Sequence, residues 1–289
     1  MIYIIVGPTG SGKTNAANII AEHLSCPIIN ADAFQIYQDM DIGTAKISKI
    51  DKSYPRYHLL DIRKPSELYS VKEYQDDFRK CISSLLKEYK DVVVVGGTGL
   101  YIRASIYDYI FIEEEISSND YSSFSNEELY EKLVSLDKEA ASKIHVNNRK
   151  RIIRALDLIS SSGRNKSDII NSQEHKLIYD DVRVLFINPD REILYQAIND
   201  RVDNMISEGL VDEVKSLVNK YTLSTTAKAA IGYKEILDYL AGNISLEEAI
   251  ELIKKRTRNY AKRQVTFFKN QFKSQVFASS NELIKEVIK

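Results

Sequence analysis

Short apolar runs recur along the chain and end at residues that interrupt strands. Ile2–Val6 is apolar and rich in β-branched residues, and Val92–Val95 is a run of valine; a glycine follows each of them. Comparable runs lie at Cys26–Ala31 and Asp181–Pro189. Segments of this length that are apolar throughout are typical of strands buried on both faces, so each of the four runs predicts a strand.

Amphipathic segments lie between these runs. From Thr14 to Leu24 the apolar residues recur on one helical face, and Val71–Tyr89 shows the same periodicity. Strands that are nearly all apolar and alternate with helices indicate a parallel sheet that helices cover on both faces. The pattern therefore predicts an α/β fold.

A different composition begins near residue 108. Residues 108–142 are acidic and rich in serine and asparagine, and a short helix is expected from Glu127. We interpret residues 108–179 as a small helical insertion with an acidic first part. The remaining segments, 1–107 and 180–289, would then form the core.

The end of the chain has a helical pattern and a local positive charge. Beyond Arg191 the periodicity is helical, and Lys254–Lys273 holds eight basic residues and no acidic one, although the net charge of the chain is −1. Such a run is commonly a solvated helix face, yet a basic face can also attract nucleic acid. Tyr260 and Phe267 interleave with the bases, a spacing more typical of core residues than of base stacking.

The composition is that of a globular protein, with 44% hydrophobic and 28% charged residues. Cys26 and Cys81 form no C-x-x-C pair, so they cannot build a zinc site alone and indicate a reducing compartment. The first strand has no basic leader before it, and no apolar run is long enough to cross a bilayer. We expect a cytoplasmic monomer with no membrane association.

Residues 7–14, GPTGSGKT, match the phosphate-binding P-loop pattern G-x-x-x-x-G-K-[ST]. The motif follows a predicted strand and opens a predicted helix, which is the context that gives it meaning. Its glycines allow backbone N–H groups to point inward, Lys13 supplies a cation, and Thr14 supplies a hydroxyl for Mg²⁺. The motif predicts a polyphosphate site in a P-loop NTPase-like sheet with a helical C-terminal region.

The residues alone do not decide what the phosphate is for. P-loop kinases place an aspartate after a later apolar strand, whereas the valine strand here ends in Gly96-Gly97-Thr98. Asp32 follows another predicted strand, so Lys13, Asp32 and Thr98 should meet at the carboxyl edge of the sheet. Asp32 could instead organise a metal or cap a helix, and Thr98 could be an ordinary loop residue. From the P-loop motif alone, a kinase is the favoured function.

Further motifs follow the P-loop in a fixed order. They are NADAFQIYQDMDIGTAK (Asn30–Lys46), HLLDI (His58–Ile62), VVGGTGLYIRA (Val94–Ala104), NNRKRIIRALDL (Asn147–Leu158), RVDNMISEGLVDEV (Arg201–Val214), AIGYKE (Ala230–Glu235) and RNYAKRQVTFFK (Arg258–Lys269). Together with the P-loop, these segments resemble the tRNA dimethylallyltransferase family, the isopentenyl transferases of tRNA. The resemblance extends from the P-loop to about Lys273.

The resemblance implies that a dimethylallyl group passes from dimethylallyl diphosphate to N6 of an adenosine beside the tRNA anticodon, with release of pyrophosphate. It assigns Asp32 as the general base, with Thr98 and Lys13 beside the reacting groups and Mg²⁺ on Thr14. The donor diphosphate would be bound by Gly7, Thr9, Gly10, Ser11, Gly12, Lys13, Thr14 and Arg201. The tRNA anticodon stem-loop would be contacted by Asp32, Ala33, Phe34, Gln35, Lys150, Arg151, Arg154, Lys228 and Lys234.

The sequence also departs from the family pattern. Ala33 stands where the family commonly has serine, and the acidic insertion is shorter than usual. The zinc-finger extension of eukaryotic relatives is missing, which favours a bacterial-type enzyme. Three alternatives stay open: an adenylate isopentenyltransferase that acts on free adenine nucleotides, a P-loop small-molecule kinase, and a non-catalytic RNA-binding protein.

Overall fold

A computed structural model describes residues 1–111, 119–163, 165, 167–168 and 175–289. The chain divides into two compact units, residues 1–105 with 179–289 and residues 106–178. Among the described helices, none combines the length and the apolar character needed to cross a membrane.

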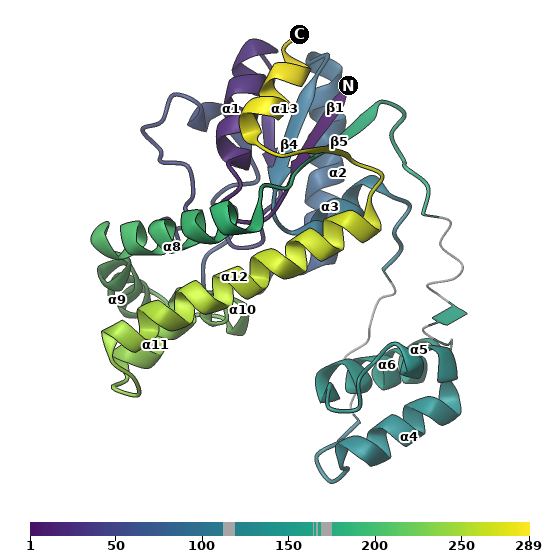
Figure 1. Ribbon diagram of the computed structural model, residues 1–289. Helices are drawn as coiled ribbons and strands as arrows, with labels where there is room; N and C mark the ends of the chain where they lie inside the picture. The colour runs from purple at the N-terminus through teal and green to yellow at the C-terminus, as the bar shows by residue number, and fades with distance from the viewer. Residues whose placement is uncertain (112–118, 164, 166, 169–174) are drawn as a thin grey trace. The chain divides into compact units, whose positions relative to one another are not determined.

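The first unit is built on a six-stranded parallel sheet (Figure 1). Its strands, in spatial order, are β3 (Tyr57–His58), β2 (Ile28–Asn30), β4 (Val92–Gly96), β1 (Ile2–Val6), β5 (Val182–Ile187) and β6 (Gln275–Phe277). In the register, Ile2 pairs with Val92 on one side and with Val182 on the other. The four predicted strands are therefore confirmed, and they form the centre of the sheet.

The two edge strands were not expected from the sequence pattern. β3 has only two residues and β6 only three, so neither contains an apolar run long enough to be noticed. The prediction that the chain is helical throughout after Arg191 is wrong at β6. There the preceding helix ends at Gln271, Phe272 is extended, and Gln275 pairs with Leu185 of β5.

Helices cover both faces of this sheet, and further helices of the same unit lie away from the sheet (Figure 1). They are α1 (Lys13–His23), α2 (Val71–Glu88), α3 (Gly99–Ile106), α8 (Arg191–Ser207), α9 (Leu210–Lys220), α10 (Thr225–Lys228), α11 (Tyr233–Leu240), α12 (Leu246–Gln271) and α13 (Ser280–Val287), with a 3-10 turn at Tyr54–Arg56.

Successive side chains of a strand point to opposite faces of the sheet, so each face can pack against its own layer of helices. Ile5 packs in one buried cluster with Ile20 of α1 and Leu283 of α13. Neighbouring strand residues point to the opposite face, where the rings of Phe186 and Phe268 of α12 have their centroids 5.8 Å apart. Because each face of the sheet meets helices, the central strands β1 and β4 are buried along their whole length, as the sequence predicts.

The second unit has a small helical core of its own. It contains α4 (Asn126–Leu136), α5 (Lys138–Ser142) and α6 (Arg149–Ser162), and Leu129, Leu133 and Ile152 are fully buried within it. The helix expected from Glu127 is confirmed as α4, which starts one residue earlier. The reason is a capping box, in which the Ser125 side chain accepts from the Glu128 N–H and Glu128 accepts from the Ser125 N–H.

The end of β4 approaches the end of β2 so closely that only glycine fits. A Cβ at Gly96 would overlap the backbone carbonyl of Ala31, which cannot move without disturbing the sheet. We expect Gly96→Ala to lower the free energy of unfolding by about 3 kcal/mol or more, as overpacking against rigid backbone does. Urea denaturation measures this loss.

Gly242→Ala is the matched control for Gly96→Ala. Gly242 has φ +75° but nothing within 4 Å of the added methyl group, so we expect a cost of about 1 kcal/mol from backbone strain alone. Equal losses for the two variants would contradict the close approach of β2 and β4.

Candidate active site

The loop between β1 and α1 has the geometry of a phosphate cradle. Gly10 and Gly12 both have φ +81°, a conformation that side chains disfavour, and Gly12 stands at the N-cap of α1 without a side-chain cap. The first N–H groups of α1 therefore lack a capping side chain and can point at a ligand. The strand, loop and helix succeed each other as the sequence predicts.

Two half-buried cations, Lys13 and Arg201, line the pocket above this loop. The Lys13 Nζ donates to the carbonyl of Pro8 at 2.6 Å, and the Arg201 guanidinium donates to the carbonyl of Thr44 at 3.2 Å. Burial lowers the pKa of Lys13 to about 7, with the charge of Arg201 as the second cause, and burial also lowers the pKa of Arg201. Because both acceptors are neutral carbonyls, a bound anion would stabilise the two charges.

The lowered pKa of Lys13 makes anion binding depend on pH. In the free protein Lys13 is mostly neutral at pH 8 and mostly protonated at pH 6, because its pKa is about 7 instead of the ordinary 10.5. A bound diphosphate favours the charged form and raises that pKa, so binding at pH 8 should take up about one proton that binding at pH 6 does not. Calorimetry of pyrophosphate binding in buffers of different ionisation enthalpy measures this uptake.

Lys13→Arg is the control, because arginine stays charged at both pH values. The number of protons that this variant takes up on binding measures the protons that pyrophosphate itself exchanges. The wild type should exceed the variant at pH 8 and match it at pH 6. The same proton count for both proteins at pH 8 would contradict a neutral Lys13.

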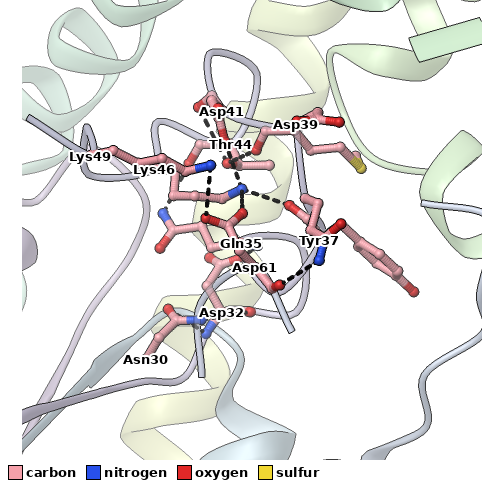
Figure 2. Close-up of polar contacts among 12 residues, drawn as sticks. Asn30, Asp32, Gln35, Tyr37, Asp39, Asp41, Thr44, Lys46, Lys49 and Asp61 are labelled. Carbon is pink, nitrogen blue, oxygen red and sulfur yellow. Dashed lines mark hydrogen bonds and ion pairs between the residues drawn. The ribbon is translucent and has the colours of Figure 1, made fainter. Parts of the chain in front are cut away.

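Asp32 follows β2 and lines the same pocket. One carboxylate oxygen, Oδ1, accepts from the backbone N–H of Phe34 at 2.9 Å and of Gln35 at 3.4 Å. The Asp32 N–H donates to the side chain of Asn30 at 3.2 Å, and these residues lie together at the start of the loop (Figure 2). Residues 33–36 form a turn and not a helix, so the interpretation of Asp32 as a helix cap is wrong, and its Oδ1 caps this turn instead. The residue also lines the pocket.

Thr98 lies beside Asp32 but acts on the backbone. Its Oγ1 accepts from the N–H of Ala33 at 3.0 Å, and its own N–H donates to the carbonyl of Ala31 at 3.2 Å. The wall of the pocket next to it is formed by Gly96 and Gly97. Thr98 thus fixes the chain on both sides of Asp32.

Gln264 is a site residue that the sequence analysis did not single out. It is 5% exposed, its Oε1 accepts from the Thr9 N–H, and its Nε2 donates to the carbonyl of Gly97, each at 2.9 Å. The side chain therefore joins the P-loop to the loop after β4. A signal was present, because Gln264 shares the buried face of α12 with Ala261 and Phe268, where an apolar residue is expected.

Polar and apolar side chains both line the pocket. Its polar end is defined by Thr9, Lys13 and Thr14 of the P-loop together with Asp32 and Arg201. Its apolar wall includes side chains from α8, from the loop before α11 and from α12, among them Val202, Met205, Ala230, Ile231 and Ile253. Such a cavity suits a ligand that carries both a charged and a hydrocarbon part.

The basic residues expected to contact nucleic acid lie in both units. Lys150, Arg151 and Arg154 are exposed on α6 of the second unit. Lys228 ends α10 and Lys234 lies on α11 in the first unit, and both are exposed. Lys150, Arg151 and Arg154 thus belong to one compact unit, and Lys228 and Lys234 to the other.

The donor set fits Mg²⁺ only as an ion shared with a ligand. Among the described residues, no group of three or more histidine, cysteine or acidic side chains could hold a metal. The Thr14 residue at the start of α1 lines the pocket and offers one hydroxyl. Mg²⁺ commonly keeps few protein ligands and takes the rest from phosphate oxygens and water, so this set is compatible with it.

Comparison with known proteins decides the family. The sequence model of the IPP transferase family matches residues 35–271. The chain belongs to the IPP transferase family. The tRNA dimethylallyltransferase of Bacillus licheniformis is 42% identical to this IPP transferase over 277 residues, which cover 93% of this chain and 88% of the relative. That of Anoxybacillus flavithermus is 41% identical over 290 residues, covering 99% and 92%.

Solved structures agree with this assignment. The tRNA isopentenylpyrophosphate transferase of Staphylococcus epidermidis superposes on this IPP transferase with a TM-score of 0.73 at 36% identity, covering 99% of this chain and 96% of that one. A eukaryotic dimethylallyltransferase solved acting on tRNA gives a TM-score of 0.81 at 27% identity, covering 96% and 74%. The parallel sheet with its flanking helices is thus the fold of this family.

Proposed function

We propose that this protein transfers the dimethylallyl group of dimethylallyl diphosphate to N6 of an adenosine next to the anticodon of tRNA and releases pyrophosphate. One observation supports this function above the others. The pocket joins two half-buried cations, Lys13 and Arg201, to a carboxylate, Asp32, and to an apolar wall, in a chain of the IPP transferase family. The cations would bind the diphosphate, the carboxylate would deprotonate the amine, and the apolar wall would contact the hydrocarbon chain.

The polar end would hold the diphosphate of the donor. Backbone N–H groups of the P-loop, with the glycines at 7, 10 and 12 and Ser11, would surround it, and Lys13 and Arg201 would neutralise it. Thr9 would contribute its hydroxyl, because its N–H already donates to Gln264. Thr14 would hold Mg²⁺, which supplies positive charge beside the diphosphate when bound. As the diphosphate leaves, the cations stabilise the charge that collects on it.

Asp32 would act as the general base on the acceptor. The exocyclic amine of adenine is a weak nucleophile because its lone pair is delocalised, so removal of its proton as the new carbon–nitrogen bond forms assists the reaction. The backbone bonds to Oδ1 and the support of Thr98 beneath Ala33 hold the carboxylate in one orientation. The apolar wall excludes water, which would otherwise capture the allylic cation.

The acceptor adenosine would have to leave its stack to reach Asp32. Phe34 and Gln35 line the pocket near Asp32, and with Ala33 they would contact the extruded nucleotide. Phosphates of the anticodon stem-loop would be bound by exposed basic side chains, namely those of Lys150, Arg151, Arg154, Lys228 and Lys234. We propose a cytoplasmic monomer; in support of a monomer, all the described residues that line the pocket belong to the first unit.

An acceptor competition tests this function. The protein is given dimethylallyl diphosphate labelled in its allyl group, Mg²⁺, and equal amounts of tRNA and AMP. We expect the label in tRNA with an equal amount of pyrophosphate, and no consumption of added ATP. Label in AMP alone would establish an adenylate isopentenyltransferase instead, and ATP consumption without transfer of the label would establish a kinase.

A further inference from the structure

The chain between Asp41 and Thr44 is held by a carboxylate from a distant helix. Glu213 of α9 accepts backbone N–H bonds from Asp41 at 3.0 Å, Ile42 at 2.7 Å and Gly43 at 3.1 Å. Three successive N–H groups that point to one side form a concave anion site, and here a side chain of the protein occupies it. Among the described residues, Glu213 is the acceptor that these three donors share, so it fixes the loop.

Tyr233 of α11 fixes the carboxylate in turn. Its hydroxyl donates to Oε1 of Glu213 at 2.6 Å, and its side chain is fully buried. A Cβ at Gly43 would come within 2.5 Å of the Tyr233 ring, so glycine allows the ring to lie against the loop. The position of Glu213 is therefore set by packing as well as by hydrogen bonds.

A second anchor holds the other end of this segment. The side chain of Lys46 is 1% exposed and donates to the carbonyl of Tyr37 at 2.6 Å. It also forms ion pairs at 2.7 Å with Asp41 and with Asp61, and Figure 2 shows these bonds converging on its ammonium group. Because both ends are anchored, the backbone at Thr44 has one defined position.

The carbonyl of Thr44 connects this loop to the pocket. It accepts from the guanidinium of Arg201 at 3.2 Å and from the side-chain amide of Gln35 at 3.1 Å. Both donors line the pocket, whereas Glu213 is absent from the described residues that line it. A shift of the loop would therefore move the acceptor that orients two site side chains at once.

We infer that Glu213 is a positioning residue for the transfer reaction, which sets Arg201 for the donor diphosphate by fixing the Thr44 carbonyl. This inference rests on the proposed function, in which Arg201 binds that diphosphate. Glu213 itself touches neither substrate. Its removal should weaken donor binding because Arg201 loses its fixed acceptor and its orientation.

Binding of dimethylallyl diphosphate by calorimetry tests the inference in four proteins: wild type, Glu213→Ala, Arg201→Ala and the double variant. We expect Glu213→Ala to raise the Kd for the donor about tenfold, since misplaced positioning groups cost up to about a hundredfold. In the Arg201→Ala background the same change should alter Kd less than about twofold, because the group through which it acts is gone.

Two further variants separate positioning from folding. Glu213→Gln keeps the shape of the side chain and one carbonyl acceptor, so its Kd for the donor should lie between those of the wild type and Glu213→Ala. If the alanine variant does not fold, Glu213→Gln replaces it in the comparison with and without Arg201. Asp212→Ala is the matched control, because Asp212 is the neighbouring acidic residue, 82% exposed and paired with Lys215 at 3.2 Å. Its Kd should equal that of the wild type.

Equal effects of Glu213→Ala with and without Arg201 would overturn the inference, because they would show a general structural role. An unchanged Kd in the Glu213 variants would also overturn it. In both cases the proposed function stands if the wild type still prenylates tRNA. A wild type that binds no donor and modifies no tRNA would contradict the proposed function itself.

Discussion

Replacement of Asp32 by asparagine should lower the turnover of tRNA prenylation by about two to four orders of magnitude, the contribution of a general base. Asparagine keeps an oxygen that can accept from the N–H groups of Phe34 and Gln35, so the loop should keep its shape. It cannot take the proton of the adenine amine. The Kd for dimethylallyl diphosphate should stay within about twofold, since the cations that bind it are untouched. Single-turnover rates with saturating donor and tRNA measure the loss.

Asp39→Asn serves as the control for Asp32→Asn. Asp39 lies in the same segment, but its carboxylate bonds to Lys220 at 2.6 Å and to Tyr221 at 2.7 Å and is not among the described residues that line the pocket. Its turnover should match that of the wild type. Near-normal turnover of Asp32→Asn would remove Asp32 from the chemistry.

Lys13→Met should produce the second large effect, a fall of about 10²–10³ in kcat/KM for dimethylallyl diphosphate. Methionine keeps the apolar part of the side chain and removes the ammonium group that neutralises the leaving diphosphate. Burial lowers the pKa of Lys13 to about 7, which shows that the free protein holds this charge at a cost. The variant should therefore unfold at a temperature no lower than that of the wild type. Steady-state kinetics and thermal denaturation measure the two quantities.

Lys52→Met is the matched control for Lys13→Met, because Lys52 is 77% exposed and bonds to Glu22 at 2.7 Å. We expect normal kinetics for this variant. A fall of less than tenfold for Lys13→Met, or a fall that accompanies loss of the fold, would contradict a direct role of Lys13 in binding the diphosphate.

The central part of the fold follows from local sequence. The strands β1 and β4 and the second half of β5 are apolar and buried, as expected of strands that helices cover on both faces, and the P-loop glycines mark the turn between β1 and α1. Asp32 comes directly after β2, so parallel topology alone brings it to the same edge as Lys13. The short edge strands β3 and β6 carry no such signal, since their place depends on a partner strand.

The residues that support the site could not be assigned in the same way. Gln264 contacts Thr9 across 255 positions, and Glu213 contacts Gly43 across 170. Gln264 shows in the pattern of α12 only as a polar residue at a buried position, whereas Glu213 is half-buried in the first turn of α9, where acidic residues are common. The role of Thr98 as a support for the Ala33 backbone also depends on how closely the ends of β2 and β4 approach, which the pattern of the strands does not specify.

Mass spectrometry of tRNA nucleosides tests the central claim most directly. The wild-type protein is incubated with unmodified tRNA, dimethylallyl diphosphate and Mg²⁺, and the tRNA is then digested to nucleosides. The proposed function predicts N6-dimethylallyl adenosine, which the Asp32→Asn variant produces at least about a hundredfold more slowly. Unchanged adenosine after incubation with folded wild-type protein that binds the donor would contradict the claim.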